Sequence, residues 1–404
     1  MRGGLTTEGS AAGLLAAHAV KGPLHAPRHG FERGAGRTAA GHGSPRCRGA
    51  HSAIVSAIGR DFSPVGDSAG SEFSDVGAGE DDVLEWRHDF NERFLVGDVI
   101  GEGNQGLVRK AVDRETGNVA AVKVLARVAG AGGMSAVEEK KVRSEARFLR
   151  RLQSCPAVAR MFGAYEDDEH VYIVMEQLDA GSMADGLEEA GRFSEREAAE
   201  LMSAVFGFLA HSHDQGIFYG DVKPANFMLG SSPCQDCRHH CSSGRLRGLA
   251  VKAIDFGTCQ QRIPGIHFRK MAGSPMYMAP EVRLGRYDVE ADLWSAGVML
   301  FQLLSGRLPF AKYDDTGELT DAGRHLGFSF EGDLWAGVSA EAKDLITKLL
   351  VRIPTQRISA RASLDHSWFQ KALGPEESYV VGKETSSIVV APKMRSVAAK
   401  VEPL

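Results

Sequence analysis

The stretch Tyr219-Gly220-Asp221-Val222-Lys223-Pro224-Ala225-Asn226-Phe227 decides how the rest of the chain is interpreted. Its glycine and proline favour an irregular loop, because proline lacks a backbone donor and keeps the preceding residue out of the helical region. Such a loop can direct the side chains of Asp221, Lys223 and Asn226 at one point. Phosphoryl transfer needs these groups: a carboxylate to orient a hydroxyl, a cation for the moving group and a neutral oxygen ligand for magnesium. A polar surface loop with an incidental aspartate is the alternative.

The composition is that of a soluble globular chain. Its 404 residues are 43% hydrophobic and 25% charged, and the formal net charge is −5. That charge provides no positive field to draw the whole molecule onto nucleic acid. The longest apolar runs, such as residues 296–304, are shorter than the about 18 residues needed to span a bilayer. We therefore expect neither nucleic-acid binding nor a membrane span.

The six cysteines are too few and too unevenly placed for a disulfide framework, which favours a reducing, intracellular compartment. Three of them, Cys234, Cys237 and Cys241, fall in an insert that also holds two histidines. Thiolates and imidazoles are zinc ligands, although a structural zinc site usually draws its second pair from farther along the chain. Zinc, a redox-responsive disulfide and an exposed loop with neither all remain open, and the exposed loop is the expectation.

The two ends of the chain predict disorder. Residues 1–60 carry eight Lys or Arg against two Glu among many Gly, Ala and His, so they cannot bury enough apolar surface to fold. This basic, acid-poor leader resembles an organelle transit peptide, for a chloroplast more than a mitochondrion. An untargeted tail on a cytoplasmic protein is the alternative. Residues 61–93 reverse the sign and predict an acidic solvated linker, and residues 370–404 predict a disordered tail.

A glycine-rich hairpin begins the structured part. A strand over residues 94–100 leads into Gly101, Gly103 and Gly106, and residues 107–112 predict the return strand. Glycine lets backbone amides approach phosphate oxygens without a Cβ in the way. A dinucleotide-binding fold would open a helix at the third glycine, whereas this pattern continues as a strand. The pattern therefore favours a hairpin that covers a nucleotide.

A lysine and a glutamate farther along predict a buried ion pair. Lys123 lies in the apolar strand 119–125, where an ammonium group needs a partner. The helical pattern over residues 136–152 contains Glu145, one turn before the inward-facing Leu149. We expect Lys123 to pair with Glu145, and the alternative is a solvated glutamate on the helix surface.

From about residue 94 to about residue 369, the chain resembles a eukaryotic protein kinase catalytic domain. Six motifs follow one another in that family's order. They are the glycine hairpin, Ala121-Val122-Lys123, Glu145, Asp221-x-Lys223-x-x-Asn226, Asp255-Phe256-Gly257 and Ala279-Pro280-Glu281. The resemblance implies an α+β fold with two lobes. The small lobe, about residues 94–176, would be an antiparallel β-sheet with one helix, and the large lobe, about residues 179–369, would be mainly helical.

The resemblance also implies ATP and Mg²⁺ as cofactors and a role for each motif residue. Asp221 would accept or orient the substrate hydroxyl with Lys223 beside it as the second catalytic residue, while Asn226 and Asp255 would ligate magnesium. The implied ATP-binding residues are Gly101, Gly103, Gly106, Val108, Ala121, Lys123, Glu145, Met175, Glu176 and Leu178. Among these, Met175 would be the gatekeeper, the backbone of Glu176 and Leu178 would hold the adenine edge, and Lys123 would hold the α and β phosphates.

Other residues would support the site. The run over residues 292–301 is too apolar for a surface helix, so the carboxylate of Asp292 must find donors there. The resemblance places that carboxylate on the backbone of Tyr219 and Gly220. It also implies two further assignments: a structural ion pair between Glu281 and Arg357, and a place for Ser274 at the substrate lip.

The closest resemblance within the family is to serine/threonine kinases. Lys223 and residues 273–281 are typical of that branch, so the implied partner is a protein substrate. Residues 221–227 and the helix around Asp185 are most similar to calcium/calmodulin-dependent and plant calcium-dependent kinases. No EF-hand loop follows the catalytic domain, so direct Ca²⁺ binding is not expected. A pseudokinase scaffold without turnover and a small-molecule kinase are the alternatives.

Two departures from the family pattern affect regulation and specificity. Tyr219-Gly220 stands where most relatives have His-Arg, and residues 258–273 contain no Ser, Thr or Tyr after Thr258. We therefore expect activity that does not require a phosphate in this segment. Ser182 and Ala225 stand where relatives that select basic sequences have glutamates, so a strong preference for an upstream arginine is not expected.

Overall fold

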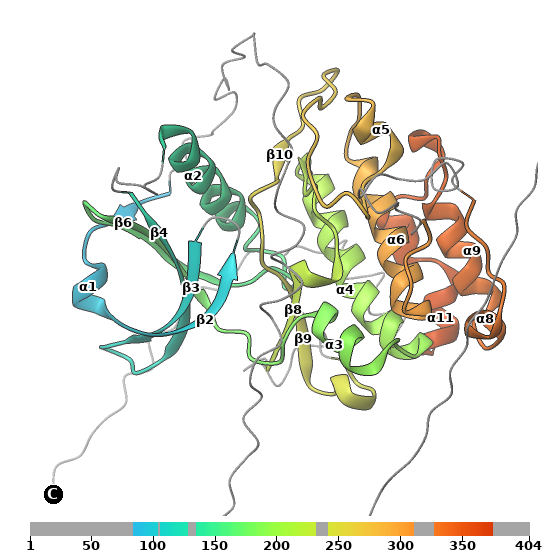
Figure 1. The fold of residues 1–404 in the computed structure, drawn as a ribbon, viewed down its shortest axis with the longest axis horizontal. Helices are drawn as coiled ribbons and strands as arrows, with labels where there is room; N and C mark the ends of the chain where they lie inside the picture. Colours follow the sequence, from blue (N-terminus) through green and yellow to red (C-terminus); the bar gives the residue numbers. More distant parts are fainter. Residues whose placement is uncertain (1–83, 104–105, 128–134, 232–240, 311–326, 375–404) are drawn as a thin grey trace, which may run out of the picture. The chain divides into compact units, whose positions relative to one another are not determined.

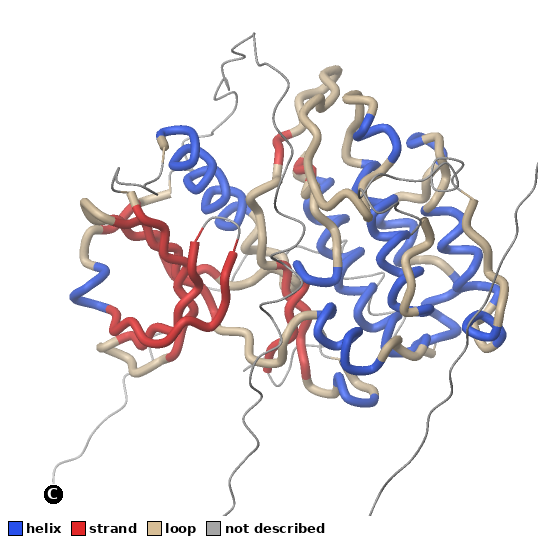
Figure 2. The backbone as a smooth tube through the Cα atoms, viewed as in Figure 1, coloured by secondary structure: helices blue, strands red, loops and turns tan. Residues whose placement is uncertain are grey.

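The computed structural model describes residues 84–103, 106–127, 135–231, 241–310 and 327–374 (Figure 1). All of them belong to one compact unit, residues 75–404. As expected, this unit is α+β and has two lobes, one built on a β-sheet and one mainly helical. Figure 2 shows most of the strands gathered in the first lobe and most of the helices in the second.

The small lobe contains a six-stranded sheet in the order β1-β5-β6-β4-β3-β2. Strands β2 to β6 pair antiparallel, and the two-residue β1 pairs parallel with β5. The strands are β1 Trp86–Arg87, β2 Phe94–Gly103, β3 Gly106–Asp113, β4 Val119–Ala126, β5 Met161–Glu166 and β6 His170–Glu176. Helix α2, Ala136–Arg151, begins at Ser135, which forms a reciprocal capping box with Glu138.

The pleat of β4 decides which side chains face α2. Ala120 and Val122 belong to a small cluster with the aromatic residues Phe90 and Tyr172, whereas Ala121 and Leu125 belong to the main core with α2. Because successive side chains of a strand alternate between its faces, Lys123 lies on the α2 face, between Ala121 and Leu125. The strand therefore delivers its one lysine toward the helix that carries Glu145.

The large lobe is organised around α6, Glu290–Ser305, which is buried along nearly its whole length. It packs against α4, Glu195–Asp214, and against α9, Ala340–Leu349 (Figure 1). A Cβ at Gly297 of α6 would lie only 2.8 Å from the Leu349 Cβ, so this glycine permits the close approach of the two helices. Within the described residues, no helix is both long enough and apolar enough to cross a membrane.

Shorter elements complete this lobe. Its other helices are α3 Met183–Ala190, α5 Pro280–Arg283, α8 Asp333–Ala336, α10 Ala360–Leu364 and α11 Ser367–Leu373. Its strands are β7 Ile217–Phe218, β8 Phe227–Ser231, β9 Leu249–Ala253 and β10 Gln260–Gln261. Strand β8 pairs with β9, and β7 pairs with β10. These two-stranded sheets place the loops that follow β7 and β9 beside each other.

The structure corrects the expected linker at its C-terminal end. Residues 61–83 lie outside the described residues, but residues 84–93 are folded rather than solvated. They contain β1 and the short helix α1, Phe90–Arg93, and Phe90 is buried and stacks on Tyr172 with ring centroids 3.8 Å apart. The acidic composition was misleading because the apolar residues between the charges supply the packing.

This N-terminal segment also reaches α2. The Arg143 guanidinium of α2 lies 4.6 Å from the centre of the Trp86 ring and forms ion pairs with Glu139 and Glu166. Trp86 itself packs on the main core. The segment therefore ties β5, its neighbour in the sheet, to the helix that carries Glu145.

The structure corrects the start of the expected tail as well. Helix α11 continues to Leu373, which is buried, because Trp368 and Phe369 anchor it in the large lobe. Residues 375–404, and with them most of the expected tail, lie outside the described residues, as do residues 1–60.

We predict that Trp86→Ala lowers the melting temperature of the protein. The change removes a cation–π contact and part of the core packing, worth about 1–2 kcal/mol together, and each kcal/mol corresponds to about 2–4 °C. Thermal unfolding of the full chain measures the effect, with Trp86→Phe retaining most of the stability. Val137→Ala, on the exposed surface of α2, is the control and leaves the melting temperature unchanged. An unchanged melting temperature for Trp86→Ala would show that the segment is not coupled to the fold.

Candidate functional site

The expected ion pair between β4 and α2 is present. The Lys123 Nζ lies 2.7 Å and 2.8 Å from the two carboxylate oxygens of Glu145. Both side chains are largely buried, with 12% and 5% of their surface exposed. Burial raises the pKa of Glu145, the Lys123 ammonium opposes that shift, and the charge of Asp255 adds to it. The pair therefore lies within the electrostatic reach of Asp255.

The glycine hairpin forms at the expected place, with Gly103 opposite Gly106 and Gly101 opposite Val108. The two residues of its tip, 104–105, lie outside the described residues. A Cβ at Gly106 would lie 2.4 Å from the Val124 carbonyl oxygen. Gly106 is therefore required by the close approach of β3 to β4, a reason that the sequence argument missed.

The segment that joins the lobes holds the expected adenine-binding residues. Met175 is buried at the end of β6, opposite Ala121. Glu176 is fixed by Arg160, because its N–H donates to the Arg160 carbonyl at 2.8 Å and its carboxylate accepts from the Arg160 N–H at 2.7 Å. In the part of the chain that the structure describes, the backbone N–H and C=O of Leu178 make no hydrogen bond. These two groups are free to meet a ligand.

The loop over residues 219–227 brings its polar side chains together. The Asn226 Nδ2 donates to the Asp221 carboxylate at 2.9 Å and to the Asp221 carbonyl at 2.8 Å. The Lys223 Nζ lies 2.8 Å from the same carboxylate. Pro224 opens a single turn of 3-10 helix over Pro224–Asn226, which turns Asn226 back toward Asp221.

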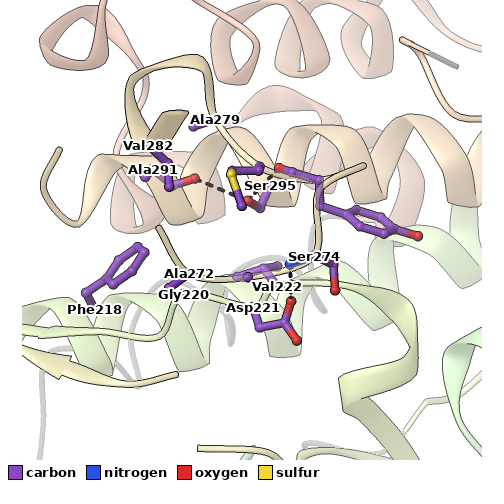
Figure 3. A pocket seen from close by; sticks show the side chains of 13 residues that line it. Phe218, Gly220, Asp221, Val222, Ala272, Ser274, Ala279, Val282, Ala291 and Ser295 are labelled. Carbon is purple, nitrogen blue, oxygen red and sulfur yellow. Dashed lines mark hydrogen bonds between the residues drawn. The ribbon is translucent and has the colours of Figure 1, made fainter. Parts of the chain in front are cut away.

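Ser274 lies directly against this loop. Its backbone N–H donates to the Asp221 Oδ1 at 2.8 Å, and its hydroxyl accepts from the Lys223 Nζ at 2.8 Å. Figure 3 shows Ser274 and Asp221 side by side in the lining of one pocket, joined by the first of these hydrogen bonds. The approach is close because Gly273, with φ +96°, has no side chain; a Cβ there would lie 2.2 Å from the Gly220 carbonyl oxygen.

The loop is held from below by a carboxylate on α6. Asp292 is buried and accepts hydrogen bonds from the backbone N–H of Tyr219 at 2.9 Å and of Gly220 at 2.8 Å, as expected. His213, at the end of α4, adds a third hydrogen bond at 2.9 Å through its Nε2. The sequence argument missed His213. The signal that could have found it is that a buried carboxylate has more acceptor sites than two donors can fill.

Asp255 follows β9 and begins a turn, in which its Oδ1 accepts a hydrogen bond from the Gly257 N–H at 3.0 Å. The next residue, Phe256, is buried against the Tyr219 ring. Burial raises the pKa of the Tyr219 phenol, and the charge of Asp255 raises it further, as do those of Asp221 and Asp292 to a smaller degree. Since Asp255 also acts on Glu145, it links the loop to the ion pair of the small lobe.

The segment after Asp255 is tied to the loop, to α2 and to β7 by hydrogen bonds and an aromatic contact. The Thr258 hydroxyl donates to the Tyr219 carbonyl at 2.7 Å. The Gln261 side chain accepts from Arg151, the last residue of α2, at 2.6 Å. Farther along, the Phe268 ring lies 5.2 Å from the Phe218 ring of β7. The sequence argument missed these contacts, because no spacing pattern marks a single Gln or Phe in a loop.

Two expected residues lie apart from this centre. Arg357 is buried and donates through both terminal nitrogens to the Glu281 carboxylate, the longer bond being 2.8 Å. Its guanidinium also lies 5.1 Å from the centre of the Trp294 ring. The pair joins α5 to α6 and the end of the domain, which agrees with a structural role.

The cysteine insert is only partly described. Cys234 and Cys237 lie outside the described residues. Cys241 is buried, and its burial raises the pKa of its thiol to about 12. Among the described residues, no group of three or more His, Cys, Asp or Glu side chains is arranged to hold a metal ion.

Comparison with known proteins agrees with this geometry. Residues 94–369 match the family described as protein kinase domain. Calcium-dependent protein kinase 7 of Arabidopsis thaliana is 34% identical over 285 residues, covering 70% of this chain and 50% of that protein. Calcium-dependent protein kinase 7 of Oryza sativa subsp. japonica is 35% identical over 280 residues, covering 69% and 48% respectively. The chain thus spans about half the length of the curated relatives it matches. By its match over most of its length, the chain belongs to the protein kinase domain family.

Proposed function

We propose that this protein transfers the γ-phosphoryl group of ATP to a serine or threonine hydroxyl of a protein substrate. The observation that carries the proposal is the convergence of Asp221, Lys223 and Asn226 under Ser274. The similarity to calcium-dependent protein kinases supports the serine/threonine branch. Because this chain covers only about half of each of those relatives, the activity of the whole protein is a proposal.

At the nucleotide end, Lys123 would neutralise the α and β phosphates while Glu145 holds its ammonium in place. Glycines 101, 103 and 106 would bring the backbone over the phosphates, and Val108, Ala121 and Met175 would enclose the adenine. The free N–H and C=O of Leu178, with the backbone of Glu176, would bind its polar edge. ATP held with Mg²⁺ supplies the phosphoryl group and the charge neutralisation that its transfer requires.

The oxygen donors present fit a magnesium ion. Mg²⁺ prefers carboxylate and amide oxygens and is usually held by one or two protein groups besides the substrate phosphates. Asn226 directs its nitrogen at Asp221, so its amide oxygen is left for a cation. Asp255 uses one carboxylate oxygen for the Gly257 N–H, so the other can ligate. We propose Asn226 and Asp255 as the ligands.

At the acceptor end, Asp221 would orient the incoming hydroxyl and accept its proton as the oxygen attacks. Lys223, which already bridges Asp221 and Ser274, would stabilise the charge on the moving phosphoryl group. Ser274 would hold the lip at the distance that the substrate chain needs. Direct Ca²⁺ binding is not part of the proposal.

We predict that Asp255→Ala abolishes phosphoryl transfer from radiolabelled ATP to a protein substrate, a loss of about 10²–10³-fold or more. The reason is that the variant loses a magnesium ligand while keeping the fold around Phe256. Asp365→Ala, at an exposed site in the large lobe, is the matched control and retains full activity. Transfer that is absent from the unchanged protein would instead favour a pseudokinase scaffold, for which the Tyr219-Gly220 departure is the one argument.

We further propose that the kinase is active without a phosphate in residues 258–273. The Thr258 hydroxyl already donates to the Tyr219 carbonyl, and the contacts of Gln261 with Arg151 and of Phe268 with Phe218 hold the segment without a phosphate. Gly220 also offers no side chain that could receive a phosphate.

We predict that phosphatase treatment of the purified protein leaves its rate of substrate phosphorylation unchanged. Mass spectrometry of the active protein should find no phosphate between residues 258 and 273. A stoichiometric phosphate on Thr258, with activity that is lost when the phosphate is removed, would contradict this prediction.

We also propose that residues 1–60 direct the protein to an organelle, a chloroplast more than a mitochondrion. The support is the composition of this leader alone, which lies outside the described residues. We predict that a tagged full-length protein is imported, whereas a protein lacking residues 1–60 stays in the cytoplasm. Fluorescence imaging of the two side by side measures this, and identical distributions would refute it.

A further inference from the structure

The exposed face beside Ser274 carries charge of only one sign. Residues 259–280 contain Arg262, Arg269 and Lys270 but no Asp or Glu. Two more arginines, Arg283 and Arg286, follow on and after α5. Of these five cations, Arg262 is neutralised, because its Nε lies 2.8 Å from the Asp288 carboxylate.

The remaining four, Arg269, Lys270, Arg283 and Arg286, form what we call the basic lip. All four are exposed, and among the described residues no carboxylate forms an ion pair with any of them. The nearby Glu281 is unavailable because it is buried against Arg357. The four cations therefore face solvent with their charge uncompensated within the described part of the chain.

The backbone of the basic lip is fixed relative to the acceptor site. Arg283 donates to the Pro275 carbonyl at 2.9 Å, and Pro275 directly follows Ser274. The Tyr287 hydroxyl donates to the Lys270 carbonyl, and Tyr287 pairs with Phe268 through two backbone hydrogen bonds. Arg283 of the basic lip therefore contacts the residue next to Ser274, whose N–H is bound to Asp221.

The opposite side of the acceptor site lacks a matching acidic pair. The pocket next to Lys223 is lined by Ala184, Glu188 and Ala225 among others. Ala225 adds no carboxylate to this lining beside that of Glu188. Ser182 is occupied in capping α3, where it exchanges hydrogen bonds with Asp185. Among the described residues that line this pocket, Glu188 is thus the one carboxylate, against four cations in the basic lip.

We propose that the basic lip selects hydroxyls followed by Asp or Glu, and that Ser71 and Ser74 of this chain are such acceptors. The inference rests on the proposed kinase function and names the substrate class of that site. Residues 66–82, GDSAGSEFSDVGAGEDD, contain six acidic residues and no basic one. In this segment Glu72 follows Ser71 and Asp75 follows Ser74, so each hydroxyl precedes a carboxylate.

The reaction is phosphoryl transfer from ATP. The serine oxygen forms a bond to the γ phosphorus, the bond from that phosphorus to the β–γ bridging oxygen breaks, and ADP leaves. The hydroxyl proton passes to Asp221 and then to solvent. The products are ADP and a phosphoserine, and no other reactant is consumed.

The acidic segment is the occupant that the charges favour. It complements the basic lip in sign, and it ends at residue 82, two positions before Leu84, the first residue that the structure describes. Nine residues lie between Ser74 and Leu84, and the ten Cα–Cα steps from one to the other would span up to about 35 Å in an extended chain. Transfer within one molecule and transfer between two copies both satisfy the proposal, and the dependence of the rate on protein concentration distinguishes them.

The first experiment incubates the full-length protein with Mg-ATP and maps its phosphates by mass spectrometry. We expect phosphate on Ser71 and Ser74, and loss of that signal in the S71A/S74A variant. Asp255→Ala serves as the inactive control. Phosphate that accumulates only at sites without a following carboxylate would overturn the assignment of these serines.

The second experiment measures selectivity with two synthetic peptides. One has the sequence of residues 66–82, and the other replaces each Glu and Asp with Gln and Asn. We expect the full-length kinase to have a kcat/KM for the acidic peptide at least about tenfold higher, since several exposed charge pairs each contribute a small factor. Equal kcat/KM values for the two peptides would refute the acidic preference.

Charge reversal tests the lip itself. In the variant Arg269→Glu, Lys270→Glu and Arg283→Glu, we expect the advantage of the acidic peptide to disappear. Lys110→Glu, with the same change at an exposed site in the small lobe, retains the advantage. The neutral peptide reports on folding, so an equal loss with both peptides would assign the lip a structural role instead.

Failure of the inference is distinguishable from failure of the proposed function. If the neutral peptide is phosphorylated as well as the acidic one, the protein is a kinase without this selectivity. If neither peptide nor any protein substrate accepts phosphate from Mg-ATP, the kinase function itself is wrong. A peptide array dominated by arginine before the acceptor would also overturn the role of the basic lip.

Discussion

The carboxylate of Asp292 is the contact on which the acceptor loop depends. Residues 219–226 of the loop are not paired in a strand, and the two leading N–H groups point inward to this one side chain. Each buried N–H left unpaired would cost about 1–3 kcal/mol, so loss of Asp292 would release the loop from α6. Helix α6 can carry such a group because it is packed on nearly all sides and does not move with the surface. A buried charge is tolerated here because three donors surround it.

Once the loop is fixed, glycine allows the other segments to reach it. Gly220, with φ +86°, adopts a conformation that side chains rarely adopt, and a Cβ there would lie 3.2 Å from the Thr258 carbonyl oxygen. The backbone of Gly273 in turn lies close to the Gly220 carbonyl oxygen. The segment from Thr258 to Gly273 therefore closes on the loop through backbone contacts at both ends. An arginine at position 220 could bind a phosphate on this segment. Glycine instead allows the two ends of the segment to contact the loop directly.

The sequence predicted the parts of the site that local chemistry demands. Lys123 in an apolar strand required a carboxylate, and the helical spacing of Glu145 supplied it. Asp292 in an apolar helix required donors in the same way. Residues whose role depends on a contact across the fold were missed, as with His213. Gly106 was predicted for the wrong reason, since the approach of β3 to Val124 appears only when the sheet is assembled. The acidic residues 84–93 were misjudged because composition averages over Trp86 and Phe90.

Tyr219 adds a buried aromatic contact to the same loop. Burial and three neighbouring carboxylates raise the pKa of the Tyr219 phenol, whereas the histidine expected here from the family pattern is a group that titrates near neutral pH. Burial and these charges therefore favour the neutral form of the phenol. Its hydroxyl has no partner among the described residues, at a cost of about 1–3 kcal/mol. The ring offsets that cost by packing against the rings of Phe208 and Phe256, and through Phe256 it fixes the residue that follows Asp255. A neutral aromatic contact thus joins the two carboxylates that the proposed reaction requires, independently of protonation.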